Sequence, residues 1–145
     1  MASYEISVHA DAPPERCFAL IADAPSWAAW ASSVISHASW EREGTPPPGG
    51  VGAIRKVGRW PSFGREEVVV DDPPSHHAYT LLSGQPVRNY RADVTFDPDG
   101  SGTRITWRGS FDPLIPGTGA LLTAFYRWLM RRFARSLAAY AAAHP

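Results

Sequence analysis

The sequence contains only one cysteine, Cys17, and only one lysine, Lys56, among 145 residues. A single cysteine excludes a disulfide bond within the chain. No run of about 18 apolar residues occurs, so we expect no stable insertion into a membrane. The opening residues, MASYEISVHADAPPE, lack the basic and apolar regions of a signal peptide. These absences together predict a cytoplasmic protein.

The chain also lacks a net charge, because 14 basic residues balance 14 acidic ones. A neutral chain argues against nucleic acid as a partner. The charges are nevertheless unevenly distributed, since no acidic residue follows Asp112 while four arginines do: Arg127, Arg131, Arg132 and Arg135. We interpret this cluster as a solvated basic face of a helix, with contact to an anionic membrane as the alternative.

Three kinds of site are not supported by any motif. The five histidines lack the spacing of metal ligands, and His76 and His77 are adjacent on a predicted strand, so their side chains diverge. Cys17 lies in a short predicted helix and is expected to be a buried small side chain rather than a nucleophile. No glycine-rich phosphate loop is present. We therefore expect no metal and no cofactor.

The length predicts one domain, residues 1–145, with a substantial core. Strands alternate apolar and polar residues, whereas helices repeat apolar residues every three or four positions. These patterns predict strands at 3–10, 34–41, 51–60, 63–70, 76–83, 87–96 and 103–111, short helices at 15–22 and 26–30, and a long helix at about 120–142. The order predicts an α+β fold in which a seven-stranded curved antiparallel sheet wraps around the C-terminal helix. A space should remain between them.

Residue alternation indicates which side chains of the last hairpin face the helix. On 87–96 the inward set is Tyr90, Ala92, Val94 and Phe96, and on 103–111 it is Ile105, Trp107, Gly109 and Phe111. Arg88 shares the phase of Tyr90 and would lie at the mouth of the space. The small residues Ala92 and Gly109 are expected to leave room rather than fill it.

The long helix carries one apolar stripe that is expected to face the sheet. Its members are Leu121, Leu122, Phe125, Trp128, Leu129, Phe133, Ser136, Leu137 and Tyr140. Six tryptophans and this stripe favour an amphipathic cavity for flat or acyl ligands over the alternative, in which the indoles serve core packing and exposure at the rim. The residues that we predict as its ligand-binding wall are Trp30, Trp40, Arg55, Tyr79, Tyr90, Trp107, Phe111, Phe125 and Leu129.

Several polar residues are candidates for chemistry inside such a cavity: Arg55, Glu66, Glu67, Arg88, Tyr90 and Arg108. Tyr90 and Arg88 would polarise a substrate carbonyl, and Glu66 or Glu67 would transfer protons. The two glutamates are adjacent on a strand, so only one can face the cavity, and the pattern leaves open which one. An ion pair with Arg55 is the simpler interpretation of an inward glutamate.

Three stretches carry a resemblance to a known family: APPERCFALIADAPSWAAW, REEVVVDDPPSHHAYTLLSGQPVRNYRADVTF and GSGTRITWRGSFDPLIPGTGALL. The chain resembles the polyketide cyclase/dehydrase branch of the START-like (SRPBCC) superfamily over nearly its whole length. The resemblance implies the helix-grip fold, with two short helices between the first two strands. It implies a cavity for a small hydrophobic or amphipathic molecule, either lipid or polyketide-like. A cofactor-independent cyclase or dehydratase is the alternative.

A partner-binding role is a third hypothesis. Trp60 and Phe63 flank a predicted turn and could form an exposed aromatic patch. Such a patch would suit a protein partner or a homodimer, whereas a purely ligand-binding domain could act as a monomer.

Overall fold

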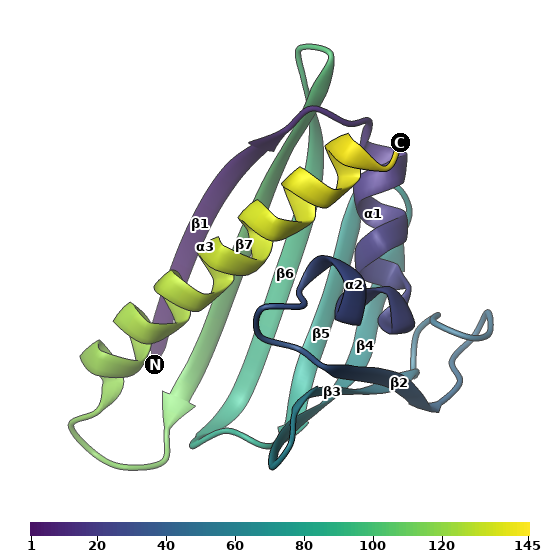
Figure 1. The fold of residues 1–145 in the computed structure, drawn as a ribbon. Helices are drawn as coiled ribbons and strands as arrows, with labels where there is room; N and C mark the ends of the chain where they lie inside the picture. The colour runs from purple at the N-terminus through teal and green to yellow at the C-terminus, as the bar shows by residue number, and fades with distance from the viewer.

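A computed structural model describes all residues from Met1 to Pro145 (Figure 1). Its sheet has seven antiparallel strands in the order β1-β7-β6-β5-β4-β3-β2. The strands are β1 (Ala2–Ala10), β2 (His37–Arg42), β3 (Ile54–Arg59), β4 (Ser62–Asp72), β5 (His76–Ser83), β6 (Val87–Asp99) and β7 (Gly102–Pro113). The helices are α1 (Pro14–Ala22), the 3₁₀ turn η1 (Ala24–Ser26), α2 (Trp27–Trp30) and α3 (Gly119–Ala143). The predicted α+β helix-grip fold is confirmed.

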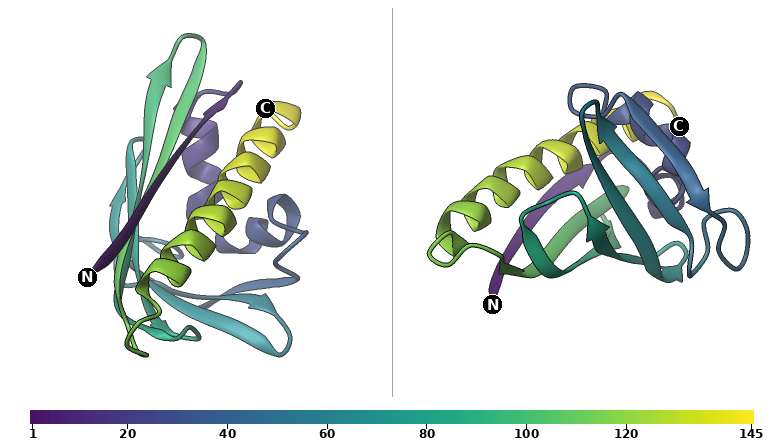
Figure 2. Two further views of the ribbon diagram at one scale, coloured as in Figure 1. Left: turned by 90° about the vertical axis from the view of Figure 1, so that its left-hand side faces the viewer. Right: turned by 90° about the horizontal axis from the view of Figure 1, so that it is seen from below.

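The helices all lie on the concave side of the sheet, as the two turned views show (Figure 2). Helix α3 packs mainly on β1 and β7, at one edge of the sheet, and α1 covers the middle strands at one end. Strands β2 to β4 curl toward the viewer below α2 (Figure 1). The helices therefore cover the sheet unevenly. None of the helices combines the length and hydrophobicity needed to span a bilayer.

The predicted inward phase of the last hairpin is confirmed, because all eight residues of the two inward sets are buried. The expectation that Gly109 leaves room is wrong. A Cβ atom at Gly109 would overlap the ring of Tyr4, which lies across the strand pair β1–β7 at the position opposite this glycine. Gly109 thus accommodates a core tyrosine and contributes nothing to a cavity.

The predicted stripe of α3 is rotated relative to the observed one. Leu121, Phe125 and Trp128 are exposed by 73%, 43% and 56%, whereas Tyr126 and Met130 are buried. The buried series Tyr126, Met130, Phe133, Leu137 and Ala141 has the same three- and four-residue spacing as the predicted one. Two overlapping apolar stripes cover this helix, and only packing against β1 and β7 selects between them.

Arg88 does not share the inward phase of Tyr90. The register between β6 and β7 shifts between Arg88 and Arg91, and Asn89 has a positive φ of 54°. An extra residue at a bulge reverses the alternation of the strand. Arg88 is consequently exposed, while Tyr90 is buried.

Candidate functional site

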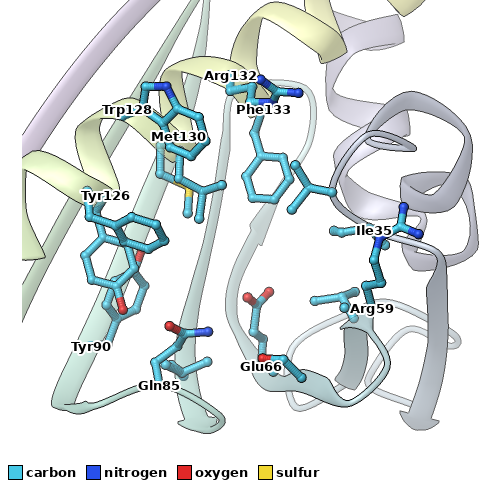
Figure 3. Close-up of a pocket in the computed structure, with 18 of the residues that line it drawn as sticks. Ile35, Arg59, Glu66, Gln85, Tyr90, Tyr126, Trp128, Met130, Arg132 and Phe133 are labelled. Carbon is cyan, nitrogen blue, oxygen red and sulfur yellow. The ribbon is translucent and has the colours of Figure 1, made fainter.

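A cavity of about 530 Å³ lies between α3, the segment after α2 and strands β3 to β6 (Figure 3). Twelve of its 20 lining residues are hydrophobic. The lining residues are Ser33, Val34, Ile35, Val57, Gly58, Arg59, Ser62, Gly64, Glu66, Tyr79, Leu81, Gln85, Tyr90, Phe125, Tyr126, Trp128, Leu129, Met130, Arg132 and Phe133. Such a size and composition are typical of pockets for small molecules.

Helix α3 supplies the apolar side of the cavity. Met130 and Phe133 point from α3 into the space, and Ile35 lies at its side in the segment after α2 (Figure 3). Phe133 is held in place by Trp107, whose ring stacks on it at a centroid distance of 6.3 Å. The apolar wall is therefore fixed by the core behind it.

Two tyrosines, Tyr90 from β6 and Tyr126 from α3, give one end of the cavity a polar character (Figure 3). The hydroxyl of Tyr90 forms a hydrogen bond with the hydroxyl of Tyr4 in the core behind it. The hydroxyl of Tyr126 is buried and has no partner within the protein. Burial raises the pKa of Tyr126 to about 12, so this hydroxyl is a neutral hydrogen-bond donor at neutral pH.

The opposite part of the cavity contains the carboxylate of Glu66, which points from β4 into the space (Figure 3). The Nε of Arg55 donates a hydrogen bond to Glu66 Oε1 at 2.7 Å. These residues face each other across β3 and β4, as the ion-pair interpretation of the sequence predicted. Arg55 is fully buried, and its guanidinium carbon lies 4.3 Å from the centre of the Trp27 ring and 4.6 Å from that of Tyr79.

His77 completes this buried network from β5. The Nη1 of Arg55 donates to His77 Nε2 at 2.9 Å, which requires Nε2 to be unprotonated and the neutral ring to carry its proton on Nδ1. His77 Nδ1 and Arg55 Nη2 are both buried without a hydrogen-bond partner. Burial, with the charge of Arg55 and then of His76 adding to it, holds the pKa of His77 well below its usual range.

We expect the free energy of unfolding to fall as the pH is lowered through the pKa that His77 has in the unfolded chain, 6.5. Below this pH the imidazole of His77 takes up a proton in the unfolded state but not in the folded state, which favours unfolding. The contribution of neutral His77 to the free energy of unfolding is therefore complete above this pH and is lost below it. Urea unfolding at about pH 7.5 and about pH 5.5 should show wild type losing about 1 kcal/mol more than His77→Gln. The glutamine retains an acceptor for Arg55. An equal loss of free energy of unfolding in the two proteins would contradict the conclusion that His77 stays neutral in the folded state.

The structure brings five of the predicted site residues to the cavity wall: Glu66, Tyr79, Tyr90, Phe125 and Leu129. Phe125 lies there as a member of the exposed stripe of α3, and Leu129 lies there as a partly buried neighbour of that stripe. Arg55 lies directly behind the wall, bound to Glu66.

Three of the other predicted wall residues lie in the core behind the cavity. Trp30 donates its Nε1 hydrogen to the carbonyl of Leu20, and Trp107 and Phe111 are completely buried. Trp40 lies elsewhere, against the loop at Gly49, where an added Cβ atom would clash with its ring.

The remaining polar candidates point away from the cavity. Glu67 faces the opposite side of β4 from Glu66 and lies 3.6 Å from Arg42. Arg108 forms an exposed ion pair with Glu5 at 2.6 Å. Of the two adjacent glutamates, only Glu66 lines the cavity.

Several cavity residues were not anticipated from the sequence. Tyr126 and Met130 belong to the second stripe of α3, whose spacing was visible in the sequence. Gln85 lines the cavity from the connection between β5 and β6, and Arg59 does so from the last position of β3, and no periodic pattern identifies such positions. Trp60, beside Arg59, is 80% exposed, while Phe63 is half-buried against His37. No group of three or more histidine, cysteine, aspartate or glutamate side chains is placed to hold a metal ion.

Comparison with known proteins agrees with this fold. The chain belongs to the family described as polyketide cyclase / dehydrase and lipid transport, which matches residues 1–142. The family resemblance of the sequence is thereby confirmed. No curated protein matches the chain by sequence.

Solved structures share the fold at low sequence identity. A START superfamily protein from Mycobacterium smegmatis superposes with a TM-score of 0.83 at 11% identity, over 97% of both chains. A protein from Nitrosospira multiformis gives 0.77 at 20% identity, over 94% of both chains. Norcoclaurine synthase from Thalictrum flavum, solved with dopamine and hydroxybenzaldehyde, gives 0.76 at 12% identity, over 99% of this chain and 87% of that one. Family and fold together define a ligand-binding domain of the START-like class.

Proposed function

We propose that this protein binds a small hydrophobic or amphipathic molecule, lipid or polyketide-like, in the cavity between the sheet and α3. The observation that carries the proposal is the cavity itself, with its volume of about 530 Å³ and its largely apolar wall. Concave, mostly apolar pockets of this size are the usual form of small-molecule sites.

The polar groups of the wall indicate what the ligand carries. The unpartnered hydroxyl of Tyr126 favours a neutral hydrogen-bond acceptor, such as a carbonyl or ether oxygen, at that end. Glu66 is neutralised by Arg55 and does not demand a cationic ligand. At the mouth, Arg59 and Arg132 favour a polar or anionic end group. The ligand is therefore expected to be elongated and mainly apolar, with a polar group near each end.

Native mass spectrometry of the protein purified from its own cells tests this proposal. We expect a defined small-molecule adduct in the native spectrum that is absent from the denatured one. If no adduct is found, titration with the apolar fluorophore anilinonaphthalene sulfonate should still show saturable binding to the folded protein. A protein that shows neither has no ligand-binding cavity in solution.

A cyclase or dehydratase activity is the second candidate, favoured by the presence of a carboxylate and two phenols in one cavity. Glu66 would transfer protons, while Tyr90 and Tyr126 would stabilise a developing oxyanion on a polyketide-like substrate. The exposed Arg88 and the outward Glu67 have no place in this scheme. The enzyme would be favoured if the wild-type protein converts an identified ligand and the double variant Glu66→Gln/Tyr90→Phe does not. Unchanged turnover in that variant would exclude these roles.

A further inference from the structure

The outer face of α3 exposes large apolar side chains beside the mouth of the cavity. Leu121, Phe125 and Trp128 are spaced by four and three residues, so they form one exposed stripe along α3. The rings of Phe125 and Trp128 lie 6.3 Å apart. In the loop before the helix, Leu114 and Ile115 are also exposed. A folded domain does not gain stability from such exposure, which is typical of an interaction surface.

The same face carries an uncompensated cluster of arginines. Arg127, Arg131, Arg132 and Arg135 surround a shallow hollow of about 590 Å³ together with Ser33, Ala124, Trp128 and Ser136. None of the four arginines lies within 4.0 Å of a carboxylate, whereas Arg42, Arg55, Arg65, Arg91, Arg104 and Arg108 all form ion pairs with carboxylates. The guanidinium of Arg132 lies 5.6 Å from the ring of Trp128, so the basic and apolar parts of this face are in contact.

We propose that this face, the stripe Leu121–Phe125–Trp128 with the arginines 127, 131, 132 and 135, docks on an anionic lipid bilayer. Exposed indole and phenyl rings beside arginines suit the interface of a bilayer, where aromatic rings lie at headgroup level and guanidinium groups bind phosphates. Free phosphate or nucleic acid would use the arginines but leave Leu121 and Phe125 unpartnered. The chain is neutral overall, so the rest of the surface is net acidic and would orient this face toward the membrane.

Docking in this orientation would place the cavity mouth against the lipid. Phe125, Trp128 and Arg132 belong both to the docking face and to the lining of the cavity. An apolar ligand could then pass between bilayer and cavity without crossing water. This last step rests on the proposed ligand-binding function, whereas docking itself does not.

Co-sedimentation with vesicles tests the docking. We expect the protein to sediment with vesicles that contain about one-third phosphatidylglycerol in phosphatidylcholine, to do so less at high salt, and not to sediment with phosphatidylcholine alone. The variant Arg127→Gln/Arg131→Gln/Arg135→Gln should bind the anionic vesicles roughly tenfold more weakly or worse. Leu121→Ser, which removes no charge, should also weaken binding. None of these four residues lines the cavity.

A matched control removes the same number of charges from the outer surface of the sheet. Arg91→Gln/Arg104→Gln/Arg108→Gln changes three exposed arginines on β6 and β7 and should leave vesicle binding unchanged. An equal loss in the two triple variants would overturn the proposal, as would equal binding to neutral and anionic vesicles. A dimer in solution that Leu121→Ser dissociates, without vesicle binding, would assign the face to a second copy instead. If the α3 triple variant no longer binds vesicles but still carries the small-molecule adduct in its native mass spectrum, vesicle docking and ligand binding are separate properties. The failure of one proposal can then be told from the failure of the other.

Discussion

Replacing Arg55 by methionine is expected to lower the free energy of unfolding by about 3–5 kcal/mol, the cost typical of breaking a buried ion pair from one side. Arg55 is fully buried between β3 and the rings of Trp27 and Tyr79, and its loss leaves the carboxylate of Glu66 without its partner. His77 also loses the hydrogen bond to its Nε2. Urea unfolding followed by circular dichroism measures the effect.

Two further variants separate the ion pair from simple loss of packing. Arg55→Met combined with Glu66→Gln should be less destabilised than Arg55→Met alone, because no unpaired carboxylate remains. Arg91→Met breaks an exposed pair with Asp93 and should cost no more than about 1 kcal/mol. If Arg55→Met costs as little as Arg91→Met, the buried network does not hold this part of the fold together.

Replacing Gly64 by phenylalanine is expected to abolish ligand binding while the fold remains intact. Gly64 lines the cavity from β4, between the inward residues Ser62 and Glu66. An added Cβ atom would meet only Leu81, at 3.6 Å, and backbone oxygens at 3.8 Å or more, so its first atom fits in ordinary contact. The ring would then occupy the space that we assign to the ligand. Native mass spectrometry should show the adduct lost.

Gly64→Ala is the matched control for this variant. It makes the same backbone change but adds a single methyl group, so it should retain the ligand. The free energy of unfolding of Gly64→Phe should stay within about 1 kcal/mol of wild type, since aromatic residues are favoured over glycine in strands. A stable Gly64→Phe protein that binds as strongly as wild type would show that the ligand does not use this cavity. In that case the vesicle-docking result would still stand.

Much of the fold was predictable because it depends on short-range pattern. The alternation of Tyr90, Ala92, Val94 and Phe96 fixed the inward face of β6 wherever the strand is regular. The prediction for Arg88 was wrong because a bulge at Asn89 breaks that alternation. No local sequence pattern predicts this bulge. Periodicity determines a face only as far as the backbone remains regular.

The candidate site was less predictable for two reasons. A helix with two overlapping apolar stripes has no unique buried face, so packing on β1 and β7 alone decided that Tyr126 is buried and Trp128 exposed. The small size of Gly109 was visible, but Tyr4, which fills the place beside it, comes from a strand more than 100 residues away in the sequence. The choice between Glu66 and Glu67 was likewise left to the tertiary structure.

The sequence by itself thus determined the order of strands and helices, the family, and the basic, acid-free character of the last helix, because each of these depends on residue types and their spacing. Only the tertiary structure decided that Glu66 faces the cavity bound to Arg55, and that Leu121, Phe125 and Trp128 are exposed rather than buried in the core. The physical reason is that a cavity and a docking face both lie where side chains are not packed against other segments. The contacts that decide this join segments distant in the chain.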